Sequence, residues 1–446
     1  MPPPPPEAAT LGLPAPPLRR SLGRAHGSIR IPRHAPFWRK FGAFMGPGYL
    51  VAVGYMDPGN WATDLAGGSR FGLDLLWVIA LSSLMAMLLQ ALSAKLGIVT
   101  GRDLAQACHD LYSAPVRIAL WLLAEIAIIA CDLAEVIGTA IALQLLFHIP
   151  LTVGVCLTAL NVVAMIALER RGFRKLEIVV VMLMILVAGC LLTEVVLSGP
   201  SPASIAAGLI PRPGDLSDPE MLFIATGIIG ATVMPHNLYL HSAVVQTRQV
   251  EAGTTGKQEA LRLAILDSVL ALSLAMLVNM AILILAASVF HAHGRVVEDI
   301  GEAYHLLSPM MGIGAASLLF GLALLASGQN STLTGTMAGQ VVMEGFTRFN
   351  MPAWARRVLA RGLAIIPAMI ATSFYGASGT AKLLIASQVV LSLQLPFAIL
   401  PLIRLTSDRA RMGSFANSRG LALLSWTIAF FITAMGAKLL FDIVRG

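Results

Sequence analysis

The chain has 446 residues, of which 57% are hydrophobic and 12% are charged, and its mean hydropathy is +0.77. Soluble proteins carry about 25% charged residues, so this chain has too few charges to cover the surfaces of the several soluble domains that its length would form. The composition excludes a soluble protein and indicates a polytopic membrane protein. The net charge of +7 therefore does not point to nucleic acid, and we expect no nucleic-acid partner.

The first 36 residues are rich in proline and arginine and include the run Pro2–Pro6. Such a segment cannot build a core, so residues 1–36 are predicted to be a disordered cytoplasmic tail. No apolar run follows the arginines until Phe41, which excludes a secretory signal peptide.

Beyond the tail lie eleven apolar runs, each near the ~20 residues that a helix needs to cross the hydrocarbon of a bilayer. Unbroken apolar runs favour helices over barrel strands, in which apolar and polar residues would alternate. The sequence therefore predicts an all-α membrane protein with eleven transmembrane helices. The limits of the runs are 41–66, 73–96, 117–147, 150–168, 177–198, 221–247, 263–290, 304–343, 358–374, 381–403 and 420–443.

Lysine and arginine gather in the cytoplasmic loops of membrane proteins. If the N-terminus is inside, 25 of the 31 lysines and arginines fall in cytoplasmic segments. A missed or spurious span would scramble this alternation, so the bias supports the count of eleven. It predicts a multi-pass protein of the cell membrane with its N-terminus in the cytoplasm and its C-terminus outside.

The first and sixth runs are interrupted near their middles, by DPGN at residues 57–60 and by MPHN at residues 234–237. Pro58 and Pro235 each remove a backbone donor and clash with the preceding turn, so both helices should unwind there. Breaks in the first and sixth of eleven spans are typical of a five-plus-five inverted repeat, in which the substrate binds near the midplane between the unwound segments. An ordinary pair of proline kinks is the alternative.

This pattern sets the expected domain organisation. Residues 37–200 form the first five-helix repeat, residues 201–403 form the second, inverted repeat, and residues 404–446 hold a loop and the eleventh helix. The odd number of helices in each repeat forces the second to enter the membrane from the opposite side.

The side chains at the breaks indicate what binds there. Asp57 offers an anionic oxygen, Asn60 a neutral oxygen and Met234 a soft thioether sulfur, while unwinding frees backbone carbonyls such as that of Ala231. Oxygen ligands alone suit Mg²⁺ or Ca²⁺, whereas a thioether favours softer transition ions. The mixture predicts a site for Mn²⁺ or Fe²⁺, with Gln388 of the tenth run completing the shell in an occluded state.

The two motifs together resemble those of the Nramp family of divalent-metal transporters, and most of all its bacterial manganese-importing branch. The resemblance runs from about Phe37 to the end of the eleventh run. It implies a LeuT-like fold, metal uptake coupled to protons, and metal ligation by Asp57, Asn60, Met234 and the carbonyl of Ala231. Gly54, where many relatives have alanine, is a departure that a backbone ligand would survive.

A second polar group lies in the third run. Glu125, Asp132 and Glu135 share one stripe of a helix because their offsets are seven and three residues. Together with Asp57 and the titratable His236, they are candidates for a proton pathway, and the resemblance implies such a network between the third and ninth spans.

Three arginines are candidate partners for these carboxylates: Arg248, Arg356 and Arg357. A structural ion pair between Asp132 and Arg248 is the alternative for the first, and cytoplasmic anchoring is the alternative for the other two.

These features favour secondary active import of Mn²⁺ and Fe²⁺ with proton symport. An amino-acid or other small-solute symporter of the same architecture is the alternative, although Asp57 would place negative charge where a substrate carboxylate binds. No repeated filter sequence indicates a channel, and no HExxH or Walker motif indicates an enzyme or an ATPase. We expect a monomer in the lipid bilayer that is not an enzyme and has no permanently bound cofactor, with the metal ion and H⁺ as substrates.

Overall fold

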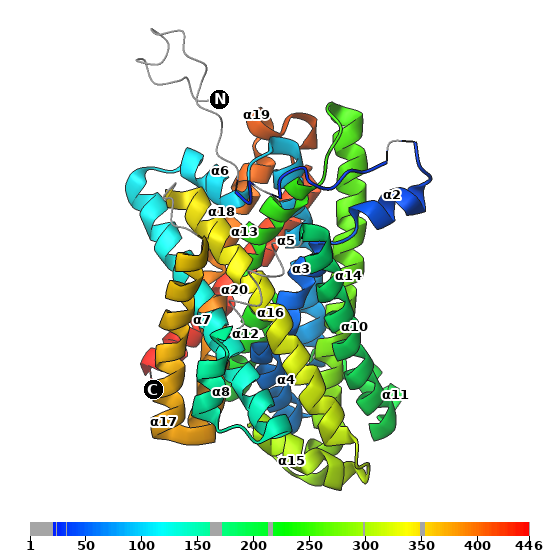
Figure 1. Cartoon of the computed structure of the whole chain (residues 1–446), viewed down its shortest axis with the longest axis vertical. Coiled ribbons are helices and arrows are strands. Elements are labelled where there is room, and N and C mark those ends of the chain that lie inside the picture. Colours follow the sequence, from blue (N-terminus) through cyan, green and yellow to red (C-terminus); the bar gives the residue numbers. More distant parts are fainter. Residues whose placement is uncertain are drawn as a thin grey trace.

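The computed structural model describes residues 21–23, 25–32, 34–160, 172–212, 217–297, 299–347 and 353–445. In this part every named element is a helix, and the one β-bridge pairs Ile29 with Arg248. Figure 1 shows long helices running along the long axis of the molecule, with short helices at its two ends.

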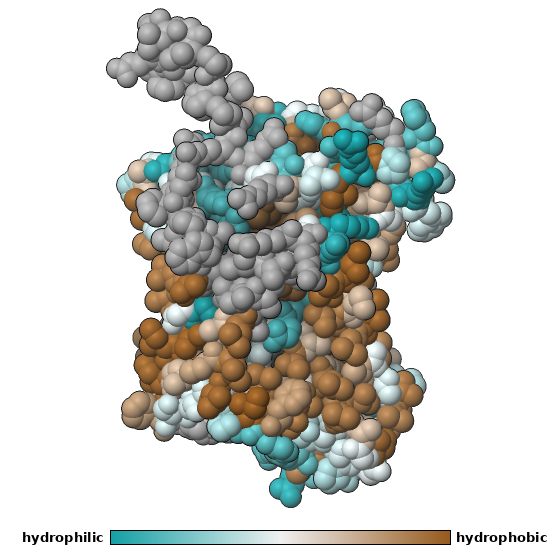
Figure 2. Space-filling view, in the orientation of Figure 1, coloured by the Kyte–Doolittle hydropathy of each residue, from teal (hydrophilic) through white to brown (hydrophobic). Residues whose placement is uncertain are grey.

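Seven helical segments of the described part are long and apolar enough to cross a membrane. Figure 2 shows that apolar side chains dominate a broad band of the visible face, while hydrophilic side chains gather toward the two ends. The prediction of an all-helical, multi-span membrane protein is confirmed. The segments are Leu76–Thr100, Ala114–Phe147, Phe173–Ser198, Pro219–Thr247, Thr254–His293, Gly379–Ser407 and Arg419–Asp442.

Most predicted runs correspond to one helix each. The fourth run is represented by α8 (Leu151–Leu157), and its remainder falls largely on residues 161–171, which lie outside the described part. The other helices that each correspond to a single predicted run are α5 (Leu76–Thr100), α7 (Ala114–Phe147), α10 (Phe173–Ser198), α14 (Thr254–Val289) and α20 (Arg419–Arg445).

The eighth run differs from its prediction as one long helix. It consists of α15 (Ile300–Met311) and α16 (Ala316–Thr347). The first ends at Gly312, whose φ of +68° is left-handed and whose N–H bonds to the carbonyl of Ser308. The ninth and tenth runs are covered by one helical element, α17 (Ala353–Gln394), followed by α18 (Pro396–Ser407).

Both predicted breaks are present. The first run contains α3 (Pro47–Ala52), the 3₁₀ turn η1 (Val53–Met56) and α4 (Pro58–Phe71), with Asp57 extended between them. The sixth contains α12 (Pro219–Thr232) and α13 (Pro235–Val244), with Met234 extended. In each case a proline occupies the first turn of the second half, where its missing N–H costs nothing.

Short elements that the apolar runs did not predict lie between the long helices. They are α2 (Phe37–Phe44), α6 (Leu104–Leu111), α11 (Pro202–Gly208), η3 (Val245–Thr247), η4 (His291–His293), α19 (Arg409–Met412) and η5 (Gly413–Phe415).

The predicted disordered tail is too long. Residues 1–20 lie outside the described part, but residues 21–23 and 25–32 lie against the helical body. Leu22 is buried there, and the N–H of Ile29 donates to the carbonyl of Thr247 at 3.0 Å. This segment is therefore part of the folded protein.

Contacts near the two ends of the molecule join segments that lie far apart in the sequence. On the face that carries the N-terminal segment, Lys40 pairs with Glu259 at 2.6 Å and Lys257 donates to the carbonyl of Val99 at 2.7 Å. On the other face, Arg212 pairs with Asp74 at 3.0 Å. Each contact joins two segments that the charge pattern assigns to the same side of the membrane.

The start of α3 is fastened to its neighbours. The carboxylate of Asp267 in α14 accepts hydrogen bonds from the N–H groups of Gly46 (3.1 Å) and Gly48 (2.7 Å). The buried guanidinium of Arg248 donates to the carbonyl of Phe44 at 2.8 Å and pairs with Glu177 of α10 at 2.5 Å. These bonds hold the first half of the broken helix against α10 and α14.

The close approach of α3 to α14 makes Gly48→Ala destabilising. A Cβ atom at Gly48 would lie 2.7 Å from backbone atoms of Asp267 and Ser268, so the helices must separate, at a cost of about 1–3 kcal/mol. Thermal unfolding in detergent should show a lower midpoint. The matched control is Gly42→Ala in α2, where no atom lies within 4 Å and the midpoint should stay or rise; equal midpoints for the two variants would contradict the packing argument.

Candidate metal site and polar network

Asp57 and Asn60 form the first half of the site. Asp57 caps the N-terminus of α4, and its Oδ1 accepts from the backbone N–H of Asn60 at 2.9 Å and from the Asn60 side chain at 2.7 Å. Both residues are buried. The other carboxylate oxygen of Asp57 has no hydrogen-bond partner in the described part, so it stays available to a ligand at the positive end of α4.

The second half of the site comes from the break in the sixth run. The carboxamide of Asn60 also donates to the carbonyl oxygen of Ala231 at 3.1 Å, which ties α4 to the C-terminal end of α12. Met234 is fully buried and packs with Ala130 and Cys131 of α7. The carboxamide of Asn237 lies 3.6 Å from the sulfur of Met234, so the thioether is held at the break.

Gln388 is brought to the same place from α17. Its carboxamide packs directly on the backbone of Gly59, because a Cβ atom there would overlap it. Its Nε2 donates to Ser387 at 3.0 Å, while its Oε1 is buried without a partner in the described part. The predicted ligand Gln388 therefore reaches the N-terminus of α4.

A second ring of contacts fixes this geometry. Asn279 of α14 donates to the carbonyl of Tyr55 at 2.8 Å and to the side-chain oxygen of Asn60 at 3.2 Å. The carbonyl of Met56 accepts from Trp61 at 3.3 Å and from Ser327 of α16. Hydrogen bonds thus satisfy some of the carbonyls that the first break frees, and the same bonds join α14 and α16 to the first broken helix.

The arrangement has the chemistry of a site for a divalent transition ion. It combines one carboxylate, amide and carbonyl oxygens and a thioether. No cluster of three or more His, Cys, Asp or Glu side chains suited to a metal occurs in the described part. A single anionic ligand suits a site that must also release its ion.

Glu135 is the centre of the polar network on α7. It is fully buried, accepts from Ser331 of α16 at 2.6 Å and pairs with Arg361 of α17 at 3.4 Å. Arg361 also donates to Thr332 at 3.2 Å. Asp132 faces the same point, because a Cβ atom on Gly335 would lie 2.9 Å from Glu135 and 3.2 Å from Asp132.

The other predicted members of the proton route lie apart from this centre. Glu125 is half-buried and accepts from Trp121 at 3.0 Å. It stands ten residues before Glu135, or about 15 Å along the helix. His236 is buried beside Met234, and its Nδ1 has no partner in the described part.

The structure describes the side chain of only one of the three arginines that the sequence suggested as partners of the α7 carboxylates. Arg248 pairs with Glu177 of α10 and therefore does not serve the acidic residues of α7. Arg356 and Arg357 lie in the first turns of α17, but their side chains are outside the description.

Sequence reasoning missed Arg361, although an arginine inside the apolar run 358–374 is the usual signal of a buried partner. It also missed Ser331 and Asn237, whose types do not distinguish a site residue from a helix-packing residue.

Comparisons with known proteins show the family to which the chain belongs. The profile of the family described as natural resistance-associated macrophage protein-like, Nramp, matches residues 48–442. The divalent metal cation transporter MntH of Bradyrhizobium diazoefficiens is 56% identical over 431 residues, which cover 96% of each chain.

Solved structures show the same relationship. The crystal structure of the manganese transporter of Eremococcus coleocola, in complex with an aromatic bis-isothiourea substituted compound, has a TM-score of 0.87 and 41% identity, covering 94% of this chain and 90% of that one. Mhp1, a nucleobase-cation-symport-1 family transporter, has a TM-score of 0.61 at 14% identity and covers 93% of this chain and 92% of its own. The second likeness shows the fold alone.

Proposed function

The chain belongs to the Nramp family, and we propose that it is a secondary active transporter that imports Mn²⁺ and Fe²⁺ together with protons. It is a transporter and not an enzyme. The metal ion is its substrate, H⁺ is the co-substrate, and no resident cofactor is needed. The similarity to MntH proteins and to a manganese transporter supports Mn²⁺ as a substrate.

The main support for this proposal is the contact between the two helix breaks. The two helix breaks meet at Asn60, which bonds to Asp57 at 2.7 Å and to the carbonyl of Ala231 at 3.1 Å. Free oxygens of Asp57 and Gln388 and the sulfur of Met234 surround this junction. The proposed metal ligands are therefore Asp57, Asn60, Ala231, Met234 and Gln388. A hard carboxylate with a soft thioether favours Mn²⁺ or Fe²⁺ over Ca²⁺ and Mg²⁺.

We propose the finer architecture on the same grounds. Eleven spans, with repeats at residues 37–200 and 201–403, place the two breaks in equivalent helices of a LeuT-like inverted repeat. The likeness to Mhp1 supports the fold. Alternating access then requires one group of helices to rock against the other around the site.

The proposed orientation places the N-terminal segment in the cytoplasm and the C-terminus outside. The excess of lysine and arginine on the N-terminal face supports it, and so do the contacts between Lys40 and Glu259 and between Lys257 and Val99. We propose a monomer in the cell membrane.

For the proton route we propose Asp57, Asp132 and Glu135, with His236 near the metal site and Glu125 toward the cytoplasm. Arg361, which was not among the expected arginine partners, pairs with Glu135. Arg356 and Arg357 remain candidates for the cytoplasmic end of the route. A buried carboxylate with both an arginine and a second carboxylate nearby can change its protonation state when its surroundings rearrange.

An amino-acid symporter is less consistent with the site. In such a transporter the N-terminus of a half-helix holds the substrate carboxylate. Here Asp57 already occupies the N-terminus of α4 and accepts from the N–H of Asn60 at 2.9 Å. A second carboxylate at this position would meet a negative charge in a buried environment.

Asp57→Asn should lower saturable Mn²⁺ uptake into proteoliposomes by about tenfold or more. Interactions with a charged group are worth about 1.5–3 kcal/mol, and 1.4 kcal/mol is a factor of ten. The matched control is Asp64→Asn, which neutralises another buried carboxyl of α4 and should keep most of the uptake. Equal loss in both variants would refute the assignment of Asp57 as a ligand.

Met234→Ala should weaken discrimination against Ca²⁺ more than it weakens Mn²⁺ binding, because it removes the soft ligand and leaves the oxygens. Competition by Ca²⁺ in a Mn²⁺ uptake assay measures this. Met184→Ala removes an equally buried thioether from α10 and serves as control. Unchanged Ca²⁺ competition in the Met234 variant would show that the sulfur does not select the ion.

Glu135→Gln should impair proton movement more than metal binding, since the carboxyl lies in the α7 network and not at the helix breaks. A pH-sensitive dye inside the vesicles reports proton entry, and calorimetry with Mn²⁺ reports binding. Glu194→Gln, a buried carboxyl of α10, is the control and should retain both. Normal proton entry in the Glu135 variant would remove Glu135 from the route.

A further inference from the structure

The described residues 21–23 and 25–32 of the N-terminal segment, called the strap from here on, have two attachments to the rest of the protein. At the first, the N–H of Leu22 donates to Glu344 of α16 at 3.3 Å, and Gln106 of α6 donates to the hydroxyl of Ser21 at 3.1 Å. Ser21 and Leu22 are both buried. This end of the strap therefore rests on α6 and the end of α16.

The second attachment is made by the backbone. The N–H of Gly27 donates to the carbonyl of Gln246 at 3.0 Å, the N–H of Ile29 donates to Thr247 at 3.0 Å, and the N–H of Gln249 returns to Ile29 at 2.9 Å. This pairing is the parallel bridge between Ile29 and Arg248. It joins the strap to the chain that leaves α13.

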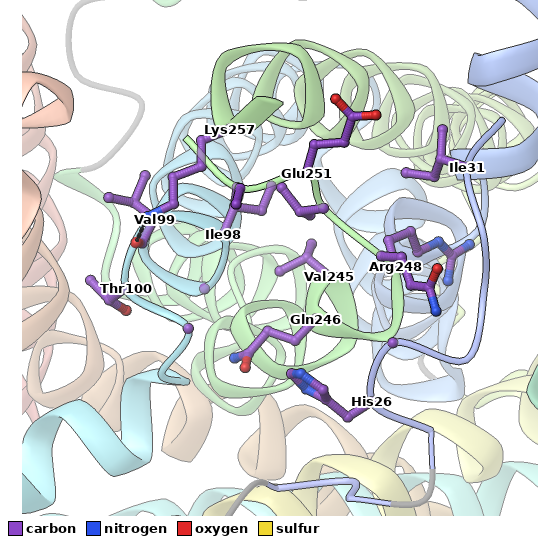
Figure 3. A pocket seen from close by; sticks show the side chains of 16 residues that line it. His26, Ile31, Ile98, Val99, Thr100, Val245, Gln246, Arg248, Glu251 and Lys257 are labelled. Carbon is purple, nitrogen blue, oxygen red and sulfur yellow. Dashed lines mark hydrogen bonds between the residues drawn. The ribbon is translucent and has the colours of Figure 1, made fainter. Parts of the chain in front are cut away.

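A cavity of about 710 Å³ lies beside this second attachment and is lined by His26 and Ile31 of the strap and by residues from the end of α5 and the chain after α13. Figure 3 shows His26 beside Gln246, and Ile31 and Arg248 on the side of the strap. The strap thus forms one wall of a space at the end of the broken sixth helix. Leu22 of the strap packs into the main hydrophobic core, whereas His26 and Ile31 face this cavity.

The two attachments lie on different structural units. α16 supplies Ser331 to the network around Glu135 on α7, whereas the chain after α13 continues the second half of a broken helix. α13 and α16 also contact each other through the rings of Tyr239 and Phe346, so a relative movement of the two elements at this face strains both attachments.

The strap also precedes the first broken helix directly. Residues 33–36, α2 and the short link at Met45–Gly46 separate it from α3. Arg248, which pairs with Ile29 through the backbone, also donates to the carbonyls of Phe44 (2.8 Å) and Met45 (2.9 Å). The strap therefore bonds to Thr247 and Gln249, the two neighbours of the residue that fastens the start of α3.

We propose that the strap is a latch that keeps the cytoplasmic side of the transporter closed by joining α16 to the chain after α13. This inference rests on the proposed function for its orientation and its transport cycle. Release of the latch frees α3 to move away from α10 and α14, and redocking closes the site again.

The test measures hydrogen exchange of the α3 amides in the full-length protein, so it does not depend on transport activity. Ile29→Pro removes the donor to Thr247 and should speed exchange in residues 48–52 by about fivefold, the factor for one backbone hydrogen bond. The matched control is Arg30→Pro, one residue along, where the exposed residue's N–H makes no hydrogen bond in the described part. It should leave α3 unchanged.

The other attachment is tested by Glu344→Ala, and the double variant with Ile29→Pro removes both. The double variant should show the fastest exchange in α3, with exchange in α20 unchanged as a sign of intact folding. Mn²⁺ binding by calorimetry should persist, because no metal-site residue is altered. Unchanged α3 exchange in the double variant would overturn the latch, whereas loss of Mn²⁺ uptake in Asp57→Asn tests the proposed function separately.

Discussion

The structure depends on one carboxamide. Asn60 joins the carboxylate of Asp57 in one broken helix to the carbonyl of Ala231 in the other, at 2.7 and 3.1 Å. Unwound backbone inside a membrane is tolerated only where other groups satisfy it. Each break therefore needs partners, and the two breaks become each other's partners through Asn60. The same unwinding exposes the oxygens that a metal ion can bind, so stability and ligand binding have one origin.

The pairing of buried carboxylates follows from the same need to satisfy polar groups inside the membrane. Buried Glu135 has an arginine, Arg361, at 3.4 Å, and buried Glu177 has Arg248 at 2.5 Å. Asp57 has only amide donors, and one of its oxygens has no partner in the described part. Breaking a buried ion pair is costly, so the paired carboxylates stabilise the helix arrangement, whereas the carboxylate without a cation is the one that gains most from a divalent ion.

The sequence predicted the features that are written into local chemistry. Pro58 and Pro235 determine where the helices break, because the missing N–H acts within one turn. The prediction was wrong where local signals are weak. Gly312 divides the eighth run through a left-handed φ, and a glycine inside an apolar run does not by itself indicate that conformation. The partner of Glu135 could not be chosen among the arginines of α17, since that choice depends on how α7 and α17 pack. The sequence also did not predict the attachment of the strap, because its backbone hydrogen bonds do not depend on side-chain type.

Contacts at the start of α3 must satisfy opposite demands. They must hold the half-helix while the site is closed, and they must break in each cycle if alternating access moves it. Arg248 and Asp267 meet the first demand with charge-assisted bonds to backbone groups at 2.7–3.1 Å. Bonds to charged groups are worth about 1.5–3 kcal/mol each, so a few of them can bias the closed state without making it permanent. The backbone pairing of the strap adds smaller increments of the same kind. Its bonds to Thr247 and Gln249, on either side of Arg248, place these increments next to the contact that has to open.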